Sequence, residues 1–288
     1  MSASRAAQIR RIDFTLPKSE IQPHMADMIV DDANHPSFQT VEGCEIAFRK
    51  RSATSTLPQR PGIVWLGGFK SDMQSTKAQR LDAFAASQGR ACLRFDYSGH
   101  GESGGRFEDG VISCWLAESL ALIRAQTSGP QIIVGSSMGG WIALLAARAM
   151  GAKEARERLA GLVLIAPAVD FTEALMWAHM SAKVRQQIET GGVWLRHSAY
   201  APDPYPITRA LIEDGRRNLL LGATVDAHAP VHILQGMQDA DVPWSHAMTL
   251  VEHLAGDCVT LSLIKDGDHR LSREEDIAAL VAAVDRIA

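Results

Sequence analysis

Residues 131–150, QIIVGSSMGGWIALLAARAM, decide the fold of this chain. The stretch opens with the branched apolar residues Ile132–Val134, which are typical of a strand buried on both faces, and it closes with the apolar spacing of a helix. Few residues connect the two, so the chain must turn sharply and hold one residue at positive φ. Gly135 and Gly139 flank Ser137 where a Cβ atom would collide with neighbouring backbone. The sequence therefore predicts a strand, a tight turn centred on Ser137, and a helix.

The predicted turn has the pattern G-x-S-x-G, which presents its central side chain above the carboxyl edge of a parallel sheet, at a helix N-terminus. Ser137 is therefore the candidate nucleophile, whereas Ser136 is off-centre between the glycines. The amide of Met138 would face a developing oxyanion, and the amide of Phe69, after the apolar run IVWL and two glycines, is the candidate second donor. Because a serine hydroxyl is a weak nucleophile, we expect a histidine and a carboxylate at later strand ends.

Two later apolar runs supply these groups. Asp239 follows the strand-like HIL in a loop reading QGMQDADVP, and His269 follows VTLSLI in a loop reading KDGDHRLS. The chain order serine, aspartate, histidine is that of the α/β-hydrolases. Asp241 is the rival acid, and we interpret it as a solvated loop carboxylate. His100, in SGHGES, is the rival base, and we expect it instead to cap backbone groups of its glycine-rich loop.

Short apolar runs alternate with amphipathic helical stretches along most of the chain, which predicts βαβ crossovers. We expect an α/β-hydrolase fold in a domain spanning 37–288: a mainly parallel sheet with helices on both faces and a hairpin at 38–53 near one edge. Residues 170–226 break the alternation, look helical or irregular with no clear strand, and predict a small helical cap inserted over the sheet edge. Residues 1–36 carry little periodic pattern and predict a loosely ordered extension.

The predicted cap is rich in aromatic and long apolar side chains. Packing within the cap would account for them, and so would an apolar slot for an acyl chain; the sequence leaves both interpretations open. The residues are Met176, Trp177, Met180, Trp194, Leu195, Tyr200 and Tyr205.

The composition is that of an ordinary soluble globular protein. Hydrophobic residues make up 46% and charged residues 22% of the 288 residues, with a formal net charge of −4. No basic block stands out, so we expect no nucleic-acid partner. No apolar run reaches the about 18 residues of a membrane-spanning helix, and the N-terminus lacks the apolar core of a secretory signal. The four cysteines are far apart and lack metal-binding spacing, which is typical of thiols in a reducing compartment, and we expect a cytoplasmic location.

Four stretches together resemble one branch of the α/β-hydrolase family. They are GPQIIVGSSMGGW (129–141), LRFDYSGHGESGG (93–105), ILQGMQDADVPW (233–244) and DHR (268–270). This branch contains the mitochondrial abhydrolase-domain palmitoyl-protein thioesterase and acyl-glucuronide esterase, and the similarity runs from about Phe48 to the C-terminus. The resemblance implies a serine hydrolase that cleaves esters or acyl thioesters of small molecules or acylated proteins without metal or organic cofactor. It implies Ser137, Asp239 and His269 as the catalytic triad.

Gln235 departs from the family pattern, because many α/β-hydrolases have histidine at this place before the glycine. Since Gln235 lies outside the expected triad, we assign it no role. Carbon–carbon bond hydrolases and lactonases use the same triad and remain alternatives. A catalytically silent binding module is the alternative of another class; silent members typically lose a triad residue, and all three residues are present here.

Overall fold

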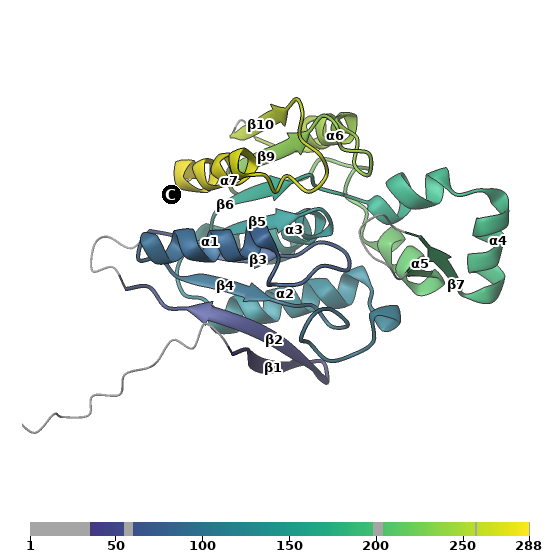
Figure 1. The fold of residues 1–288 in the computed structure, drawn as a ribbon, viewed down its shortest axis with the longest axis horizontal. Coiled ribbons are helices and arrows are strands. Elements are labelled where there is room, and N and C mark those ends of the chain that lie inside the picture. The colour runs from purple at the N-terminus through teal and green to yellow at the C-terminus, as the bar shows by residue number, and fades with distance from the viewer. Residues whose placement is uncertain (1–34, 55–59, 198–203, 257, 288) are drawn as a thin grey trace, which may run out of the picture. The chain divides into compact units, whose positions relative to one another are not determined.

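An eight-stranded sheet forms the centre of the domain, and the computed structural model describes residues 35–54, 60–197, 204–256 and 258–287. Its strands are β1 (Ser37–Val41), β2 (Cys44–Arg51), β3 (Gly62–Leu66), β4 (Cys92–Phe95), β5 (Gln131–Ser136), β6 (Leu159–Ile165), β9 (Val231–Gly236) and β10 (Val259–Ile264). They lie in the order β1-β2-β4-β3-β5-β6-β9-β10, as Figure 1 shows. β2 is antiparallel to β1 and β4, and the other neighbours are parallel, as expected.

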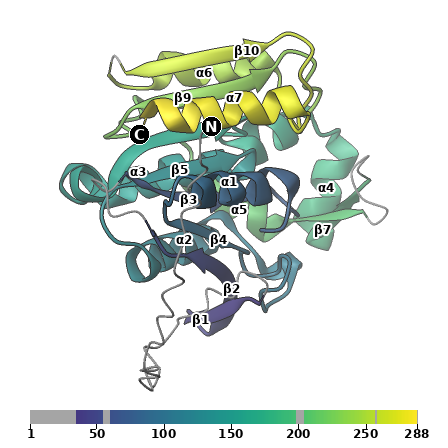
Figure 2. The same cartoon turned by 60° about the vertical axis from the view of Figure 1, so that its left-hand side comes forward.

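Helices cover both faces of this sheet. α1 (Thr76–Ser87) and α7 (Glu274–Ile287) pack on one face, and α2 (Ile112–Gln126), α3 (Met138–Arg158) and α6 (Trp244–His253) pack on the other. Figure 2 shows α1 and α7 in front of the strands. Successive strand residues point to opposite faces, so Ile132 packs in the α1 and α7 layer and Ile133 in the α2 and α3 layer. Both layers are apolar, which explains why the strand reads as an unbroken apolar run.

The segment 170–226, which we call the cap, contains more than helices. It has α4 (Ala182–Gly191), α5 (Arg209–Arg217), short turns at Thr172–Met176 and Trp177–His179, and an antiparallel pair of strands, β7 (Val193–Arg196) and β8 (Tyr205–Thr208). The expectation that the cap has no clear strand was therefore wrong. Each strand has only four residues and β8 includes Pro206, so neither shows a readable alternation. The strands exist because they pair with each other and cover the cap interior.

Two buried carboxylates fix the base of the cap to the rest of the domain. Asp170, held at φ 57°, accepts hydrogen bonds from the amides of Leu220 and Leu221, which joins the beginning of the cap to its end. Asp214 on α5 accepts from the amide and the hydroxyl of Ser113 on α2, both at 2.8 Å. The base is thus held by charge-assisted hydrogen bonds rather than by apolar contact alone.

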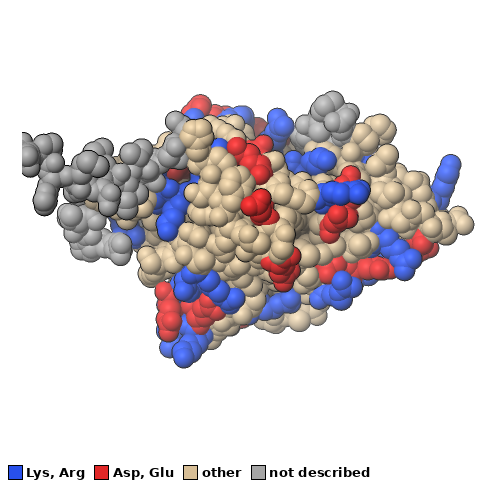
Figure 3. Space-filling model, turned by 90° about the horizontal axis from the view of Figure 1, so that it is seen from below, with Lys and Arg blue, Asp and Glu red and all other residues tan. Residues whose placement is uncertain are grey.

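Residues 1–34 of the expected N-terminal extension lie outside the described residues. Among the helices that the structure does describe, none combines the length and the apolar character needed to cross a membrane. On the face of the molecule seen in Figure 3, lysine and arginine side chains are interspersed with aspartate and glutamate side chains.

Candidate active site

Ser137 lies on a strained turn between β5 and α3. Its φ is 54° and its ψ is −116°, a conformation that L residues rarely adopt. A Cβ atom at Gly135 would collide with the carbonyl of Gly139, and one at Gly139 would collide with the carbonyl of Leu66. The amide of Ser137 donates to the carbonyl of Ile165 at 2.8 Å, which holds the turn against the neighbouring strand. The two glycines therefore make room for the turn that presents the Ser137 hydroxyl.

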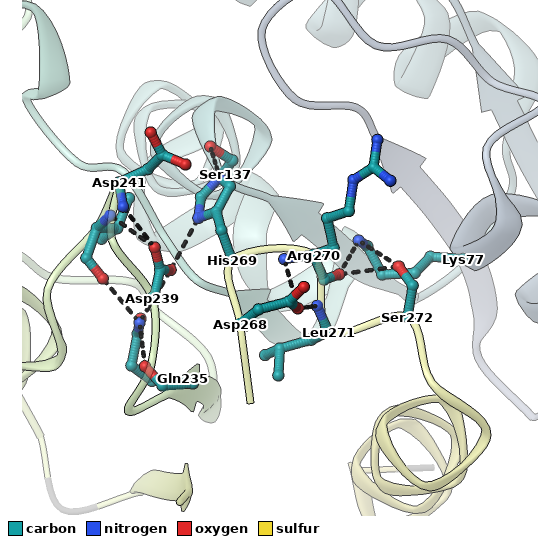
Figure 4. Close-up of polar contacts among 12 residues, drawn as sticks. Lys77, Ser137, Gln235, Asp239, Asp241, Asp268, His269, Arg270, Leu271 and Ser272 are labelled. Atoms are coloured by element: carbon teal, nitrogen blue, oxygen red, sulfur yellow. Dashed lines mark hydrogen bonds and ion pairs between the residues drawn. The ribbon is translucent and has the colours of Figure 1, made fainter. Parts of the chain in front are cut away.

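Ser137, His269 and Asp239 form a chain of hydrogen bonds, seen in Figure 4. Ser137 Oγ lies 3.1 Å from His269 Nε2, and His269 Nδ1 lies 2.8 Å from Asp239 Oδ2. Because a carboxylate only accepts, the proton between His269 and Asp239 belongs to Nδ1, so that in the neutral ring Nε2 can accept from the hydroxyl. The structure thus brings together the three residues that the sequence placed on separate strand ends.

The Asp239 carboxylate is fully buried and has donors on both oxygens. Oδ1 accepts from the amides of Asp241 and Val242, at 2.9 and 2.8 Å. Oδ2 accepts from His269 and also from Gln235 Nε2, at 3.2 Å. The sequence reasoning missed this contact of Gln235, although the departure from the family histidine at that place was the signal that could have found it.

Two side chains hold the loop that carries His269, one from within the loop and one from α1, as Figure 4 shows. Asp268 Oδ1 accepts from the amides of Arg270 and Leu271, at 3.0 and 2.9 Å. Lys77, at the beginning of α1, donates from Nζ to the carbonyl of Arg270. Burial lowers the pKa of Lys77 to about 8. These contacts fix the backbone on the C-terminal side of His269.

The candidate oxyanion donors lie on either side of the Ser137 turn. Met138 is the first residue of α3, so its amide has no carbonyl partner within the helix. Phe69 belongs to the loop after β3. A Cβ atom on Gly68 in that loop would lie 3.4 Å from both Ser136 O and Ser137 Cβ, so the loop runs directly against the turn.

His100 holds the loop that contains Phe69. Its Nε2 lies 3.1 Å from the amide nitrogen of Lys70, and its Nδ1 lies 3.0 Å from the carbonyl oxygen of Ser98. An amide only donates and a carbonyl only accepts, so the ring must be neutral with its proton on Nδ1. Burial, the largest cause, lowers the pKa of His100 from 6.5 to about 4. His100 thus binds a backbone group of its own glycine-rich loop, as expected, and also one of the loop after β3, which was not expected.

Asp241, the rival acid, lies beside the triad and toward the cap. Its Oδ1 is 3.8 Å from the guanidinium of Arg196 on β7. Ligand atoms of Asp239, Asp241 and His269 lie within 4.8 Å of one another, a spacing that a metal ion can use. Asp239 and His269 already bind each other through these atoms, and His269 also faces Ser137. The arrangement therefore suits proton transfer better than metal ligation.

The side chain of Phe69 connects the sheet edge to the cap. Its ring centroid lies 5.6 Å from that of Phe171 and 6.0 Å from that of Tyr205 on β8. It packs with the cap cluster, whose other half-buried members are Met176, Trp177, Met180, Val184, Trp194 and Tyr205. Of the remaining residues expected here, Leu195 is 53% exposed, and Tyr200 lies outside the described residues. A cavity of about 310 Å³ on the cap is lined by residues other than the triad.

Comparison with known proteins identifies the family. The model of the Alpha/beta hydrolase family matches residues 62–284. The palmitoyl-protein thioesterase ABHD10, mitochondrial, of Homo sapiens is 34% identical over 241 residues, which are 83% of this chain and 75% of the relative. The Bos taurus protein of the same name is 35% identical over 226 residues, which are 78% of this chain and 72% of the relative. A crystal structure of a putative hydrolase from Agrobacterium vitis S4 shares 46% identity at a TM-score of 0.82, covering 88% of this chain and 97% of that chain.

The solved structure of alpha/beta hydrolase domain-containing protein 10 from mouse shares 29% identity at a TM-score of 0.77, with coverage of 88% and 97%. The expectation of a cytoplasmic location was wrong, because the curated relatives are named as mitochondrial proteins. The expected fold and the expected resemblance to the thioesterase branch agree with the family match and with these relatives. The chain belongs to the alpha/beta hydrolase family.

Proposed function

We propose that this chain hydrolyses acyl thioesters and carboxylic esters through an acyl-enzyme formed on Ser137. The observation that carries the proposal is the hydrogen-bonded chain from Ser137 Oγ through His269 to the buried carboxylate of Asp239, with contacts of 3.1 and 2.8 Å. A hydroxyl bonded to a neutral imidazole that is itself held by a carboxylate is the arrangement of a serine hydrolase.

In this mechanism His269 Nε2 takes the Ser137 proton while Oγ attacks the acyl carbonyl carbon. Asp239 holds the imidazole in the required tautomer and stabilises the imidazolium that forms. The amides of Met138 and Phe69 donate to the tetrahedral oxyanion, and each is expected to lower the barrier by about 3 kcal/mol. The thiol or alcohol leaves with the proton from His269. Water, activated by the same imidazole, then cleaves the acyl-enzyme.

The substrate class we favour is a long-chain acyl thioester of a small molecule or an acylated protein. The relatives at 34% and 35% identity are named palmitoyl-protein thioesterases. Half-buried apolar side chains of the cap, among them Met176, Trp194 and Tyr205, pack with Phe69 against one buried cluster and offer the apolar contact that an acyl chain requires. We therefore favour an acyl slot over cap packing alone for these residues.

The test is a substrate panel assayed with the wild type, Ser137→Ala and Ser136→Ala. Rates are measured on short p-nitrophenyl esters, long-chain acyl thioesters, lactones and vinylogous diketones. We expect hydrolysis of the esters and thioesters, and Ser137→Ala should lower kcat by about 10⁶-fold because the nucleophile is lost. Ser136→Ala removes the neighbouring hydroxyl, which is off-centre between the two glycines, and should stay within about tenfold of the wild type.

A Ser137→Ala protein that keeps its esterase activity would refute the mechanism. Cleavage confined to the diketones or lactones would favour the carbon–carbon bond hydrolase or lactonase alternative. A phosphonate probe for active-site serines gives an independent measurement. It should label the peptide containing Ser137 in the wild type and leave the alanine variant unlabelled.

A further inference from the structure

We propose that Gln235 is a positioning residue for the triad, which holds Asp239 in place and spreads its negative charge. The proposal rests on the proposed function, because it acts through Asp239 and His269. Gln235 is the penultimate residue of β9 and is fully buried. It lies beneath the loop that carries Asp239, as Figure 4 shows.

Three acceptors fix the orientation of the Gln235 amide. Its Nε2 lies 3.2 Å from Asp239 Oδ2, 3.1 Å from the carbonyl of Gly236 and 2.9 Å from the carbonyl of Val242. The opposite orientation would place Oε1 against three oxygens, so the NH₂ group must face Asp239. This one amide joins the end of β9, the triad carboxylate and the loop beyond it.

The oxygen of the Gln235 amide indicates that packing alone does not account for a glutamine at this position. Gln235 Oε1 is buried and has no hydrogen-bond partner among the residues that the structure describes. A buried acceptor without a partner is destabilising, and methionine would fill the same space without one. What methionine would lack is an N–H donor to Asp239 Oδ2. The donor is therefore the feature that distinguishes glutamine from an apolar residue here.

The consequence for the reaction follows from the four donors on Asp239. Two N–H groups on each oxygen match the capacity of a carboxylate and prevent its rotation, which keeps Oδ2 directed at His269 Nδ1. Without Gln235, Oδ2 would carry more unshared negative charge and would stabilise the imidazolium of His269 more strongly. The neutral base would then be less populated at low pH, and the carboxylate would be free to turn.

The experiment compares three substitutions of similar size at one position. Gln235→Met removes the donor, Gln235→Glu puts a second carboxyl group beside Asp239 with which it must share a proton, and Gln235→His supplies a ring N–H. Steady-state kinetics on a thioester give kcat, KM and the pH profile of kcat/KM, and circular dichroism and thermal unfolding identify the variants that fold. Apart from the substituted side chain, the charged groups around the triad are unchanged in the variants: Arg196 and Asp241 toward the cap, and Lys77, Asp268 and Arg270 around the His269 loop.

We expect Gln235→Met to lower kcat by about 10- to 100-fold with little change in KM, as for loss of a hydrogen bond to a charged group. The acid limb of its pH profile should move to higher pH by roughly half a unit to one unit. Gln235→Glu should lose more activity than Gln235→Met, and Gln235→His should stay within about tenfold of the wild type because a donor is restored. If Gln235→Met does not fold, the comparison of Gln235→Glu with Gln235→His still tests the donor.

Two results would overturn the proposal. One is a folded Gln235→Met protein with the kcat and the acid limb of the wild type. The other is a folded Gln235→His protein as impaired as Gln235→Met or Gln235→Glu, which would indicate a need for glutamine itself rather than for a donor. Ser137→Ala, assayed in parallel, separates this outcome from failure of the mechanism. An active alanine variant would refute the triad, whereas an inactive one leaves only the role of Gln235 in question.

Discussion

The triad and the cap differ in how their side chains are held. Each triad side chain has partners with defined geometry, down to the four donors around the Asp239 carboxylate. In the cap, two buried carboxylates fix the base. The half-buried side chains Met176, Trp194 and Tyr205 pack instead through apolar surface against a small buried cluster within the cap. Directional contacts fix reacting atoms to fractions of an ångström, whereas apolar contacts tolerate other shapes. On the proposed function, substitutions at the sheet edge should therefore affect the chemistry, and substitutions in the cap should affect substrate choice.

The largest effect that would test this comparison is expected for Asp239→Asn. The amide preserves the size of the side chain but favours the wrong imidazole tautomer, so kcat should fall by about 10⁴-fold with little change in KM. Steady-state kinetics on a short ester, which makes little use of the cap, provide the measurement. Asp241→Asn is the matched control, since Asp241 lies beside the triad and faces Arg196. A larger loss in Asp241→Asn than in Asp239→Asn would reverse the assignment of the acid.

The same difference explains how much the sequence could predict. The turn at Ser137 is a local structure with a local signature, because its two glycines are required by close backbone approach. Asp239 and His269 could be placed because parallel strands end at one edge of a sheet, so strand ends distant in sequence meet there. Nothing local indicates β7 and β8, since their pairing depends on each other and on the cap interior. The departure of Gln235 from the family histidine marked the position, but its role could not be assigned because it depends on where the amide points.

A second prediction concerns the loop beside Ser137 and its dependence on pH. The pKa of His100 is lowered to about 4 in the folded protein, against 6.5 for an ordinary histidine, mainly by burial. As the pH falls, His100 therefore binds a proton more readily in the unfolded chain than in the folded chain. Its contribution to the free energy of unfolding is fully present above pH 6.5 and is lost as the pH falls toward 4. Between pH 7 and pH 4.5 this group should account for about 2 kcal/mol of the free energy of unfolding.

The measurement is urea unfolding of the wild type and His100→Phe at pH 7 and at pH 4.5. The phenylalanine variant loses the hydrogen bonds to Lys70 and Ser98 at both values, but it has no proton to bind. The stability advantage of the wild type should therefore be larger at pH 7 and shrink by about 2 kcal/mol at pH 4.5. The remaining histidines and carboxylates titrate alike in both proteins and cancel. A difference that does not change with pH would mean that His100 is protonated without cost in the fold.

The smallest effect is expected in the cap, where Tyr205→Ala should change substrate choice rather than chemistry. The Tyr205 ring lies 6.0 Å from that of Phe69, at the junction of the cap with the sheet edge. Its loss should lower kcat/KM for a palmitoyl thioester by about tenfold relative to an acetyl thioester. The effect is modest because one apolar side chain contributes only a small free-energy difference between two substrates. Leu195→Ala, on the paired strand but 53% exposed, is the matched control and should leave the ratio unchanged. Equal losses of kcat on both substrates would show that the cap supports the reacting groups directly, and the separation between the two regions would then be wrong.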